Sequence, residues 1–380
     1  MIVRAPAYLA RFRCVGAACE DHCCGGWQGV DVDAPTYERY LGVDEPTLGP
    51  LLRLHVIRNE DPAATATEHA LIDVTGDGGC PFLTGERLCA IQGTLGEALL
   101  PSTCDTFPRL ATLIDGTIDV GGRLACPEIA RLVLLDPDAL AIGEAEPDRR
   151  LRERGRFWIE APWLDEPEEG DPRRHYHRVR ARCLDLLGRG DVALGARLRA
   201  LGLALGELSD ATHLHAESVD WAFAEAARHA DRQWTRAADS GPEPSELLLA
   251  RIRVWVAMQG VPARYRRCLD RLRDGLGLPT DPNASLSSRT RAAYAAALDG
   301  HVRPYLRARP HLLENLLANV IHVSTSPYHP RRSFASEYAV LVCRLAILII
   351  HLAGAAAAER RLTDELVVET VQAFDKYADS

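Results

Sequence analysis

The sequence predicts a mainly α-helical protein whose N-terminal part is a cysteine-rich metal-binding region with short strands. Eight of the eleven cysteines lie between Cys14 and Cys126. From residue 176 onward, apolar residues recur with the 3.6-residue period of helices, or alanine and leucine dominate. The 380 residues are 47% hydrophobic and 26% charged, which is typical of folded proteins and excludes wholesale disorder.

Three segments follow from this pattern: a cysteine-rich region at 1–135, a connecting segment at 136–175 and a helical domain at 176–380. The connecting segment is rich in proline and charge, as in LDEPEEGDPRR. The net charge is −9, and no basic domain stands out, so the sequence gives no support to nucleic-acid binding. All basic residues except Lys376 are arginine, and together with the heavy use of alanine this indicates a GC-rich bacterial genome.

The cysteine-rich region contains three recognisable elements. WQGVDVD (27–33) alternates apolar and polar residues in part, as a strand with one buried face does. TLIDGTIDV (112–120) places Asp115-Gly116 between two apolar runs, which predicts a hairpin because a tight turn requires positive φ. A helix should begin just after Cys126, because Pro127 is tolerated in a first turn.

Periodicity then predicts a series of helices, separated by glycine and proline. They are expected at 176–188, 193–208, 217–237, 245–258, 288–307, 311–323, 335–353 and 362–377. Residues 339–358 are apolar enough to resemble a membrane span, but Arg344 and His351 lie inside them and a charge would be costly in lipid. We therefore expect a buried helix there and no membrane span.

The cysteines indicate a metal rather than disulfides. The first residues, MIVRAPAYLARFRC, contain no long apolar run and no cleavage site, so no signal peptide is expected and the protein should be cytoplasmic. Disulfides are rare in that compartment, and an odd number of cysteines fits poorly with complete pairing. Cys183, Cys268 and Cys343 stand alone in the predicted helical domain and are expected to pack as small apolar residues.

Eight cysteines are the candidate metal ligands. They are Cys14, Cys19, Cys23, Cys24, Cys80, Cys89, Cys104 and Cys126. Four thiolates complete a tetrahedral zinc site or a cubane iron–sulfur cluster, so eight could form two sites, or one site plus structural thiols. The spacing contains no pair of C-x-x-C knuckles and no C-x-x-x-C-x-x-C loop. It therefore predicts a metal and leaves the choice of metal open.

Two blocks of this region resemble the flagellin lysine-N-methylase family. They are FRCVGAACEDHCCGGWQGVDVDAPTYERY (12–40) and CPFLTGERLCAIQGTLGEALLPSTCDTFPR (80–109). CPEIARLVLL (126–135), HLLENLLANVIHV (311–323) and the final VVETVQAFDKYADS fit the same pattern. The first two blocks are also similar to a broader group of small bacterial proteins described as zinc- or iron-chelating domains. The helical half favours the methylase branch.

The resemblance implies an iron–sulfur cluster (4Fe-4S, with zinc as the alternative) and S-adenosylmethionine as methyl donor. The substrate would be an amine, either a protein lysine as in flagellin or a small molecule. Two other functions stay open. The protein could be a non-catalytic zinc- or iron–sulfur-binding or redox protein, or an iron–sulfur enzyme doing other chemistry on a natural-product precursor. S-adenosylmethionine binding separates the first of these from a methylase.

A conventional loop for S-adenosylmethionine is missing. The one glycine-rich candidate, DVTGDGG (73–79), leads into CPFL rather than into a helix, so it is better interpreted as a turn that presents Cys80. With the resemblance, this absence suggests that an iron with an open coordination position could bind the amino and carboxylate groups of S-adenosylmethionine.

Helix 311–323 supplies the remaining candidates, because Asn315 and Asn319 share a narrow polar face on an otherwise apolar helix. We expect this face and Glu314 to line a pocket that opens toward the cysteines. Methyl transfer needs a proton acceptor, such as a carboxylate or a phenol. The predicted catalytic residues are Glu314 and Tyr328. The predicted substrate- or cofactor-binding residues are Asn315, Asn319, Glu337, Arg344, Trp27 and Asp31. Arg344 is expected to pair with an acid, for which Glu337 is the candidate.

Overall fold

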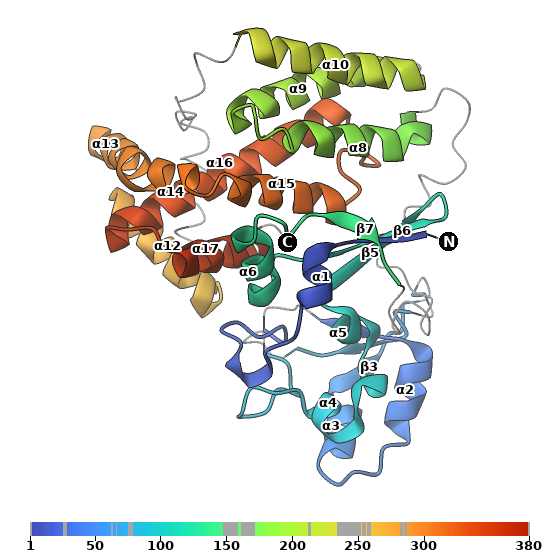
Figure 1. The fold of residues 1–380 in the computed structure, drawn as a ribbon. Helices are drawn as coiled ribbons and strands as arrows, with labels where there is room; N and C mark the ends of the chain where they lie inside the picture. Colours follow the sequence, from blue (N-terminus) through green and yellow to red (C-terminus); the bar gives the residue numbers. More distant parts are fainter. Residues whose placement is uncertain are drawn as a thin grey trace.

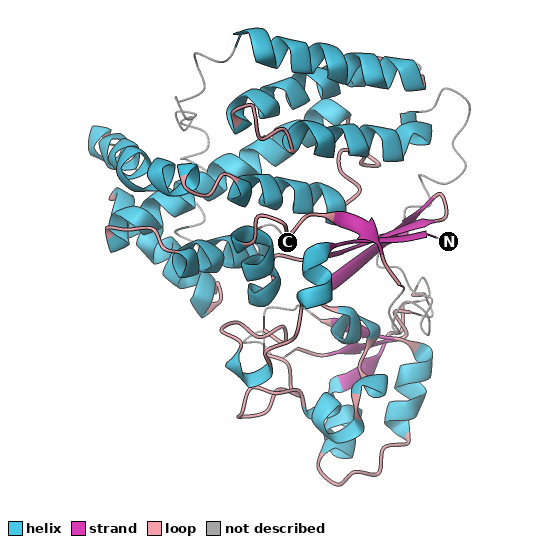
Figure 2. Cartoon of the chain, in the orientation of Figure 1, coloured by secondary structure: helices cyan, strands magenta, loops and turns pink. Residues whose placement is uncertain are grey.

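The fold is mainly helical, as predicted, and within the described residues the short strands all lie in the N-terminal part (Figures 1 and 2). The structure is a computed structural model. The structure describes residues 2–25, 29–61, 64–65, 67–74, 79–146, 159–160, 172–211, 214–233, 252, 256, 260–281, 284 and 287–378. Most of the predicted connecting segment 136–175 and of the predicted helix 245–258 lies outside these residues.

A mixed sheet joins the two halves of the molecule, in the order β7-β1-β6-β5-β8. Its strands are β1 (Ile2–Pro6), β5 (Arg109–Ile114), β6 (Thr117–Gly122), β7 (Ile142–Glu144) and β8 (Ile159–Glu160). The predicted hairpin is confirmed: Asp115 and Gly116 have φ of 49° and 69°, and β5 pairs with β6 on either side of them. The sequence did not predict β1, which pairs in parallel with β6.

The lower part of Figure 1 is a small body with its own hydrophobic core. Its elements are β2 (Val30–Val32), α2 (Ala34–Leu41), α3 (Leu48–His55), β3 (Val56–Arg58), β4 (Ala70–Ile72), α4 (Ala90–Leu95) and α5 (Ser102–Thr106). The predicted strand at 27–33 corresponds to β2, which pairs with β4. The side chains of Val30 and Val32 are buried in the core, whereas Asp31 between them is exposed.

The helical half begins with the predicted helix after Cys126. Its helices are α6 (Pro127–Leu135), α8 (Tyr176–Leu187), α9 (Leu194–Asp210), α10 (Ala216–Gln233), α12 (Ala263–Leu276), α13 (Ser288–Ala297), α14 (Arg303–Arg307), α15 (His311–Val323), α16 (Phe334–Glu359) and α17 (Asp364–Tyr377). A π-helical turn, η5 (Leu298–Val302), joins α13 to α14, so the predicted run 288–307 is continuous. The sequence analysis missed α12, although Tyr265, Cys268 and Leu272 lie on its buried face at helical spacing.

Helix α16 is the central helix of this half, and Ser333 caps its N-terminus by accepting from Ser336 N–H. It is long and apolar enough to cross a membrane by length and composition alone, but 61% of its most apolar stretch is buried within the fold. That degree of burial is what a core helix of a globular protein shows, and it agrees with the expected buried helix.

The large core extends into the predicted cysteine-rich region. Tyr8, Phe12, Cys126 and Ile129 pack in the same core as the helices beyond residue 176, whereas the separate small core draws on residues between 30 and 104. The division predicted at residue 135 stays a prediction. The cores themselves show that the sheet and α6 pack against the helical half.

Candidate functional site

The last helix, α17, holds the loop that carries the first four cysteines. The Asp21 carboxylate lies 3.1 Å from Lys376 Nζ, and it accepts hydrogen bonds from Gln372 (2.8 Å) and Tyr377 (3.2 Å). Lys376 Nζ also donates to the His22 carbonyl at 3.1 Å. Both Asp21 and Lys376 are about nine-tenths buried, so the only lysine of the chain is used to fix the cysteine loop.

Three of the predicted ligands meet at one point. The backbone N–H of Cys80 donates to the Cys24 carbonyl, and Gly25 pairs with Gly79 in a short bridge. This pairing brings the Cys24 thiol into hydrogen-bond contact with Cys23 and Cys80. Hydrogen bonding with Cys24, whose single S–H can serve one of them at a time, lowers the pKa of Cys23 and of Cys80 to about 7, whereas the pKa of Cys24 itself is raised.

The other thiols lie around this point and in a second group. Burial is the main cause of the raised pKa values of Cys89 and Cys104. The nearby thiols of Cys23 and Cys80 raise these pKa values further. Burial raises the pKa of Cys126 to about 12, and the nearby thiols of Cys19 and Cys14 contribute to this rise. The eight cysteines therefore divide by proximity into a group of five (Cys23, Cys24, Cys80, Cys89 and Cys104) and a group of three (Cys14, Cys19 and Cys126).

The donor chemistry of these groups fits a soft metal, because thiolates favour zinc and iron–sulfur clusters. None of the eleven cysteines forms a disulfide. However, within the residues that the structure describes, no group of three or more His, Cys, Asp or Glu side chains is arranged to hold a metal ion. The predicted metal centre therefore stays a prediction.

The two asparagines of α15 are buried, and protein groups satisfy them. Asn319 donates to the Gly122 carbonyl at 3.0 Å and accepts from the Tyr8 hydroxyl at 2.7 Å. Tyr8 in turn accepts from the Gly122 N–H at 2.6 Å. Asn315 donates to two backbone carbonyls at the C-terminal end of α6. The burial expected from the apolar helix is correct, and the partners of the two amides are the Tyr8 hydroxyl and backbone groups of β6 and α6.

Glu314, by contrast, does line a cavity. The cavity measures about 550 Å³ and lies between α9, α14, α15 and α16, with Arg197 and Glu314 among its lining residues. The two side chains form an ion pair, and Arg197 also donates to the Leu187 carbonyl. Arg197 is only 3% exposed, and its Nε–H has no hydrogen-bond acceptor in the described structure. One wall of the cavity is thus formed in part by a buried arginine that is paired with Glu314 and has one unpartnered N–H.

The remaining predicted residues of the helical half have other surroundings. Tyr328 is buried, with its ring 5.3 Å from that of Tyr176 and 4.8 Å from that of Phe334. Glu337 forms its ion pair with Arg332, so the expected pair with Arg344 is not what the structure contains. Glu337 thus pairs with Arg332 in the loop before α16, and not with Arg344, which lies seven residues further along the same helix.

Arg344 lies instead beside Asp375 of α17, with which it lines a small apolar cavity of about 40 Å³. Burial raises the pKa of Asp375, and the charge of Arg344 partly offsets this effect. Asp31, on the exposed face of β2, is not brought to the cysteines by any described contact, and Trp27 lies outside the described residues.

Sequence reasoning missed Asp21, Lys376 and Arg197. Lys376 carried a signal, because it is the single lysine of the chain and lies in a segment that resembles the family. Arg197 carried none, since it is one of many arginines and its burial depends on where α15 packs against α9.

Comparison with known proteins places the helical half in a family. Residues 180–378 match the FliB lysine N-methylase C-terminal domain. The Lysine-N-methylase of Salmonella typhimurium is 37% identical over 142 residues, which cover 37% of this chain and 35% of that protein. The Flagellar biosynthetic protein FliU of Salmonella muenchen is also 37% identical over 142 residues, which cover 82% of its length.

The chain thus spans about a third of the length of the lysine-N-methylases that it matches, including that of Salmonella choleraesuis at 36% identity. No solved structure matches it. The match to the C-terminal domain extends over just more than half of the 380 residues and contains the whole cavity around Arg197 and Glu314. On this evidence the chain belongs to the FliB lysine N-methylase family, as its cysteine blocks and final helices predicted.

Proposed function

We propose that this chain is a cytoplasmic, S-adenosylmethionine-dependent N-methyltransferase that modifies a lysine of a protein and carries an iron–sulfur cluster on its N-terminal cysteines. The observation that carries the proposal is the family match over residues 180–378, together with relatives named Lysine-N-methylase. The relative named for flagellar biosynthesis makes a flagellar protein the first substrate to test.

The cavity beside Arg197 is our candidate for the S-adenosylmethionine site. Its apolar walls suit an adenosine group, and the arginines among its lining residues, which include Arg197, suit the carboxylate of the methionine part. The alternative from the sequence is that an iron held on the N-terminal cysteines chelates S-adenosylmethionine.

We assign Glu314 as the group that accepts the proton of the substrate amine. S-adenosylmethionine supplies an electrophilic methyl group when it is bound, and only a neutral amine can attack it. A substrate lysine reaches the site as an ammonium and must lose a proton first. The Glu314 carboxylate can attract that ammonium and accept its proton, while the ion pair with Arg197 fixes its orientation. The apolar surroundings favour the neutral amine by desolvation.

An iron–sulfur cluster on the group of five cysteines would tie the loop at Cys23 and Cys24 to Cys80. The thiolates that such a cluster requires are favoured at Cys23 and Cys80, whose pKa values lie near 7. The reducing cytoplasm would keep these thiols available.

The cluster is tested by purifying the whole chain without oxygen and measuring iron, acid-labile sulfide and zinc. We expect a brown protein with iron and sulfide, and loss of both in Cys24→Ser and Cys80→Ser, because removal of one ligand weakens a site that is coupled to folding. Cys343→Ser changes an exposed cysteine on α16 and should retain the metal. A colourless, folded protein with stoichiometric zinc would refute the cluster.

The methylase activity is tested by transfer of a labelled methyl group from S-adenosylmethionine to a flagellar filament protein. Glu314→Gln is expected to lower kcat about a hundredfold or more, which is the usual contribution of a general base. Glu225→Gln changes a partly exposed acid on α10 and should leave kcat unchanged. Metal content without S-adenosylmethionine binding would instead favour a non-catalytic metal protein, and transfer only to small amines would exclude a protein substrate.

A further inference from the structure

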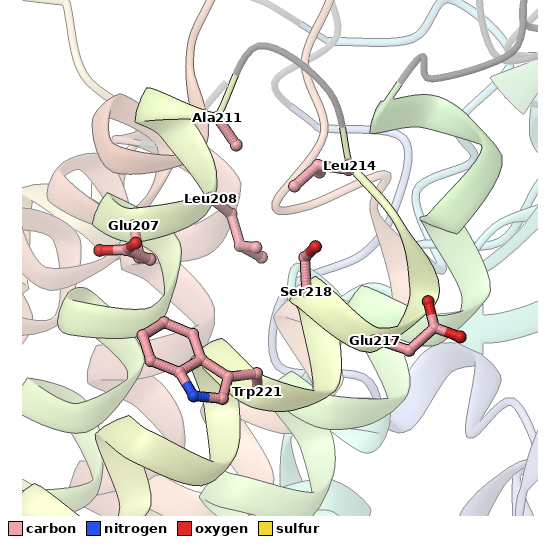
Figure 3. Close-up of a pocket in the computed structure, with 7 residues that line it drawn as sticks. All are labelled: Glu207, Leu208, Ala211, Leu214, Glu217, Ser218 and Trp221. Carbon is pink, nitrogen blue, oxygen red and sulfur yellow. The ribbon is translucent and has the colours of Figure 1, made fainter.

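A second cavity, of about 430 Å³, opens between α9 and α10, away from the residues used above. Figure 3 shows its lining: Leu208, Ala211, Leu214 and Ser218 surround the space, Trp221 and Glu207 lie on one side, and Glu217 lies on the other. Leu208 and Leu214 are 3% and 1% exposed, so the base of this cleft is a fixed apolar surface.

Trp221 is the unusual residue of the cleft. Its side chain is 55% exposed, and no other aromatic residue is found among the exposed large apolar side chains of the described structure. More than half of the surface of this residue is therefore left uncovered by the fold. Such residues are typical of binding surfaces, where the ring provides a rigid contact area.

The two carboxylates of the cleft have no ion-pair partner in the part of the chain that is described. Their neighbours on α10 do: Asp220 pairs with Arg178 and Arg182 of α8, and Glu225 pairs with Arg228. Glu207, on the same side as Trp221, and Glu217, on the opposite side, thus leave uncompensated negative charge at the two edges of the cleft, with both carboxylates directed outward from the space in Figure 3. This combination attracts a cation, because carboxylates and the face of an indole both favour positive charge.

We propose that the α9–α10 cleft binds a basic side chain, lysine or arginine, of the protein that the enzyme modifies. The aliphatic stem would lie against Leu208 and Trp221, and the cationic end would lie near Glu207 or Glu217. The chemistry of a basic side chain is argued from the cleft alone. That its bearer is the protein substrate rests on the proposed function.

Direct binding tests the cleft without any methyl transfer. The whole chain is titrated in a calorimeter with a short lysine-bearing peptide and with the same peptide in which norleucine replaces lysine. Norleucine keeps most of the aliphatic stem and removes the charge. We expect the lysine peptide to bind, with an affinity that falls as salt is added, and the norleucine peptide to bind at least several-fold more weakly.

Three variants localise the binding. Trp221→Ala should weaken the lysine peptide roughly fivefold, as expected for the loss of an exposed cation–π contact. The double variant Glu207→Gln/Glu217→Gln should weaken it comparably and remove most of the salt dependence. Leu203→Ala, an exposed position on α9 that does not line the cleft, is the matched control and should bind normally. Equal binding of both peptides, no binding, or normal binding in the first two variants would overturn the proposal.

Failure of the cleft proposal can be distinguished from failure of the proposed function. If the wild-type chain transfers no methyl group but Trp221→Ala still loses the peptide, the cleft stands and the proposed function falls. If methyl transfer occurs, Trp221→Ala should raise KM for the protein substrate several-fold with kcat unchanged. An unchanged KM together with unchanged peptide affinity would remove the cleft alone.

Discussion

Replacing Asp119 with alanine is expected to lower the free energy of unfolding by about 3–5 kcal/mol, because it leaves a buried charge without its partner. Asp119 is 4% exposed and lies on β6. It accepts from Arg4 of β1 at 2.9 and 3.0 Å and forms an ion pair with Arg180 of α8, which is itself 3% exposed. The pair therefore joins two strands of the sheet to the helical half.

The same helix provides a matched control. Arg178 and Arg182 flank Arg180 on α8, and both form ion pairs with Asp220 at the surface. Asp220→Ala removes a carboxylate with two arginine partners, as Asp119→Ala does, but in solvent. We expect it to cost about 1 kcal/mol or less. Urea unfolding of the two variants at pH 7 gives the comparison, and equal losses would mean that burial does not decide the effect.

The Asp119 variant should also change the response to acid. Burial alone would raise the pKa of Asp119, but Arg180 and Arg4 outweigh burial, so the net pKa lies below its ordinary value. A carboxylate with a lowered pKa stabilises the folded state above its unfolded pKa of about 3.9 and loses this contribution as pH falls through the folded value. The wild type should therefore lose stability below about pH 4, and Asp119→Ala should lose less there.

Protonation of His322 should cause a separate loss of stability as pH falls, in a range above that in which Asp119 acts. Burial, together with the charge of Arg180, lowers its pKa to about 4. The unfolded chain, with a histidine pKa near about 6.5, then binds the proton more tightly than the folded state. Stability should therefore fall between about pH 6.5 and pH 4 in both the wild type and Asp119→Ala, which separates this effect from that of Asp119.

Gly275→Ala is expected to destabilise the protein by about 3 kcal/mol, at the upper end of the usual cost of overpacking a core. A Cβ at Gly275 of α12 would lie 2.1 Å from the Gly354 carbonyl oxygen of α16 and 2.9 Å from the Ala358 nitrogen. Both are backbone atoms of a core helix, so they cannot move aside as a flexible side chain would. The two helices must separate, and their shared apolar contact is lost.

Gly206→Ala is the control for this prediction. Gly206 lies in the middle of α9, and a Cβ there would meet no heavy atom within 4 Å. The same substitution should stabilise the protein by about 0.5–1 kcal/mol, because alanine loses less conformational entropy in a helix. Thermal unfolding of both variants checks the opposite signs. A loss at Gly206, or none at Gly275, would contradict the packing argument.

The chain's local features were determined by its sequence. Helix 311–323 has the predicted bounds, and the Asp115-Gly116 turn is where the apolar runs placed it. Hydrophobic period and turn chemistry act over a few residues, so they can be read without knowledge of the fold. The family was also readable, because its cysteine blocks lie in short continuous segments, and the match to residues 180–378 agrees with it.

Only the tertiary structure decided which distant residues meet. Asn319 bonds to Gly122, Glu314 pairs with Arg197, and the cysteine loop is held through Asp21 by the last helix. These partners are more than 100 residues apart, and each contact depends on how helices pack on one another and on the sheet. Local periodicity shows that a side chain will be buried, but the partner that satisfies it is set by the packing of the whole fold.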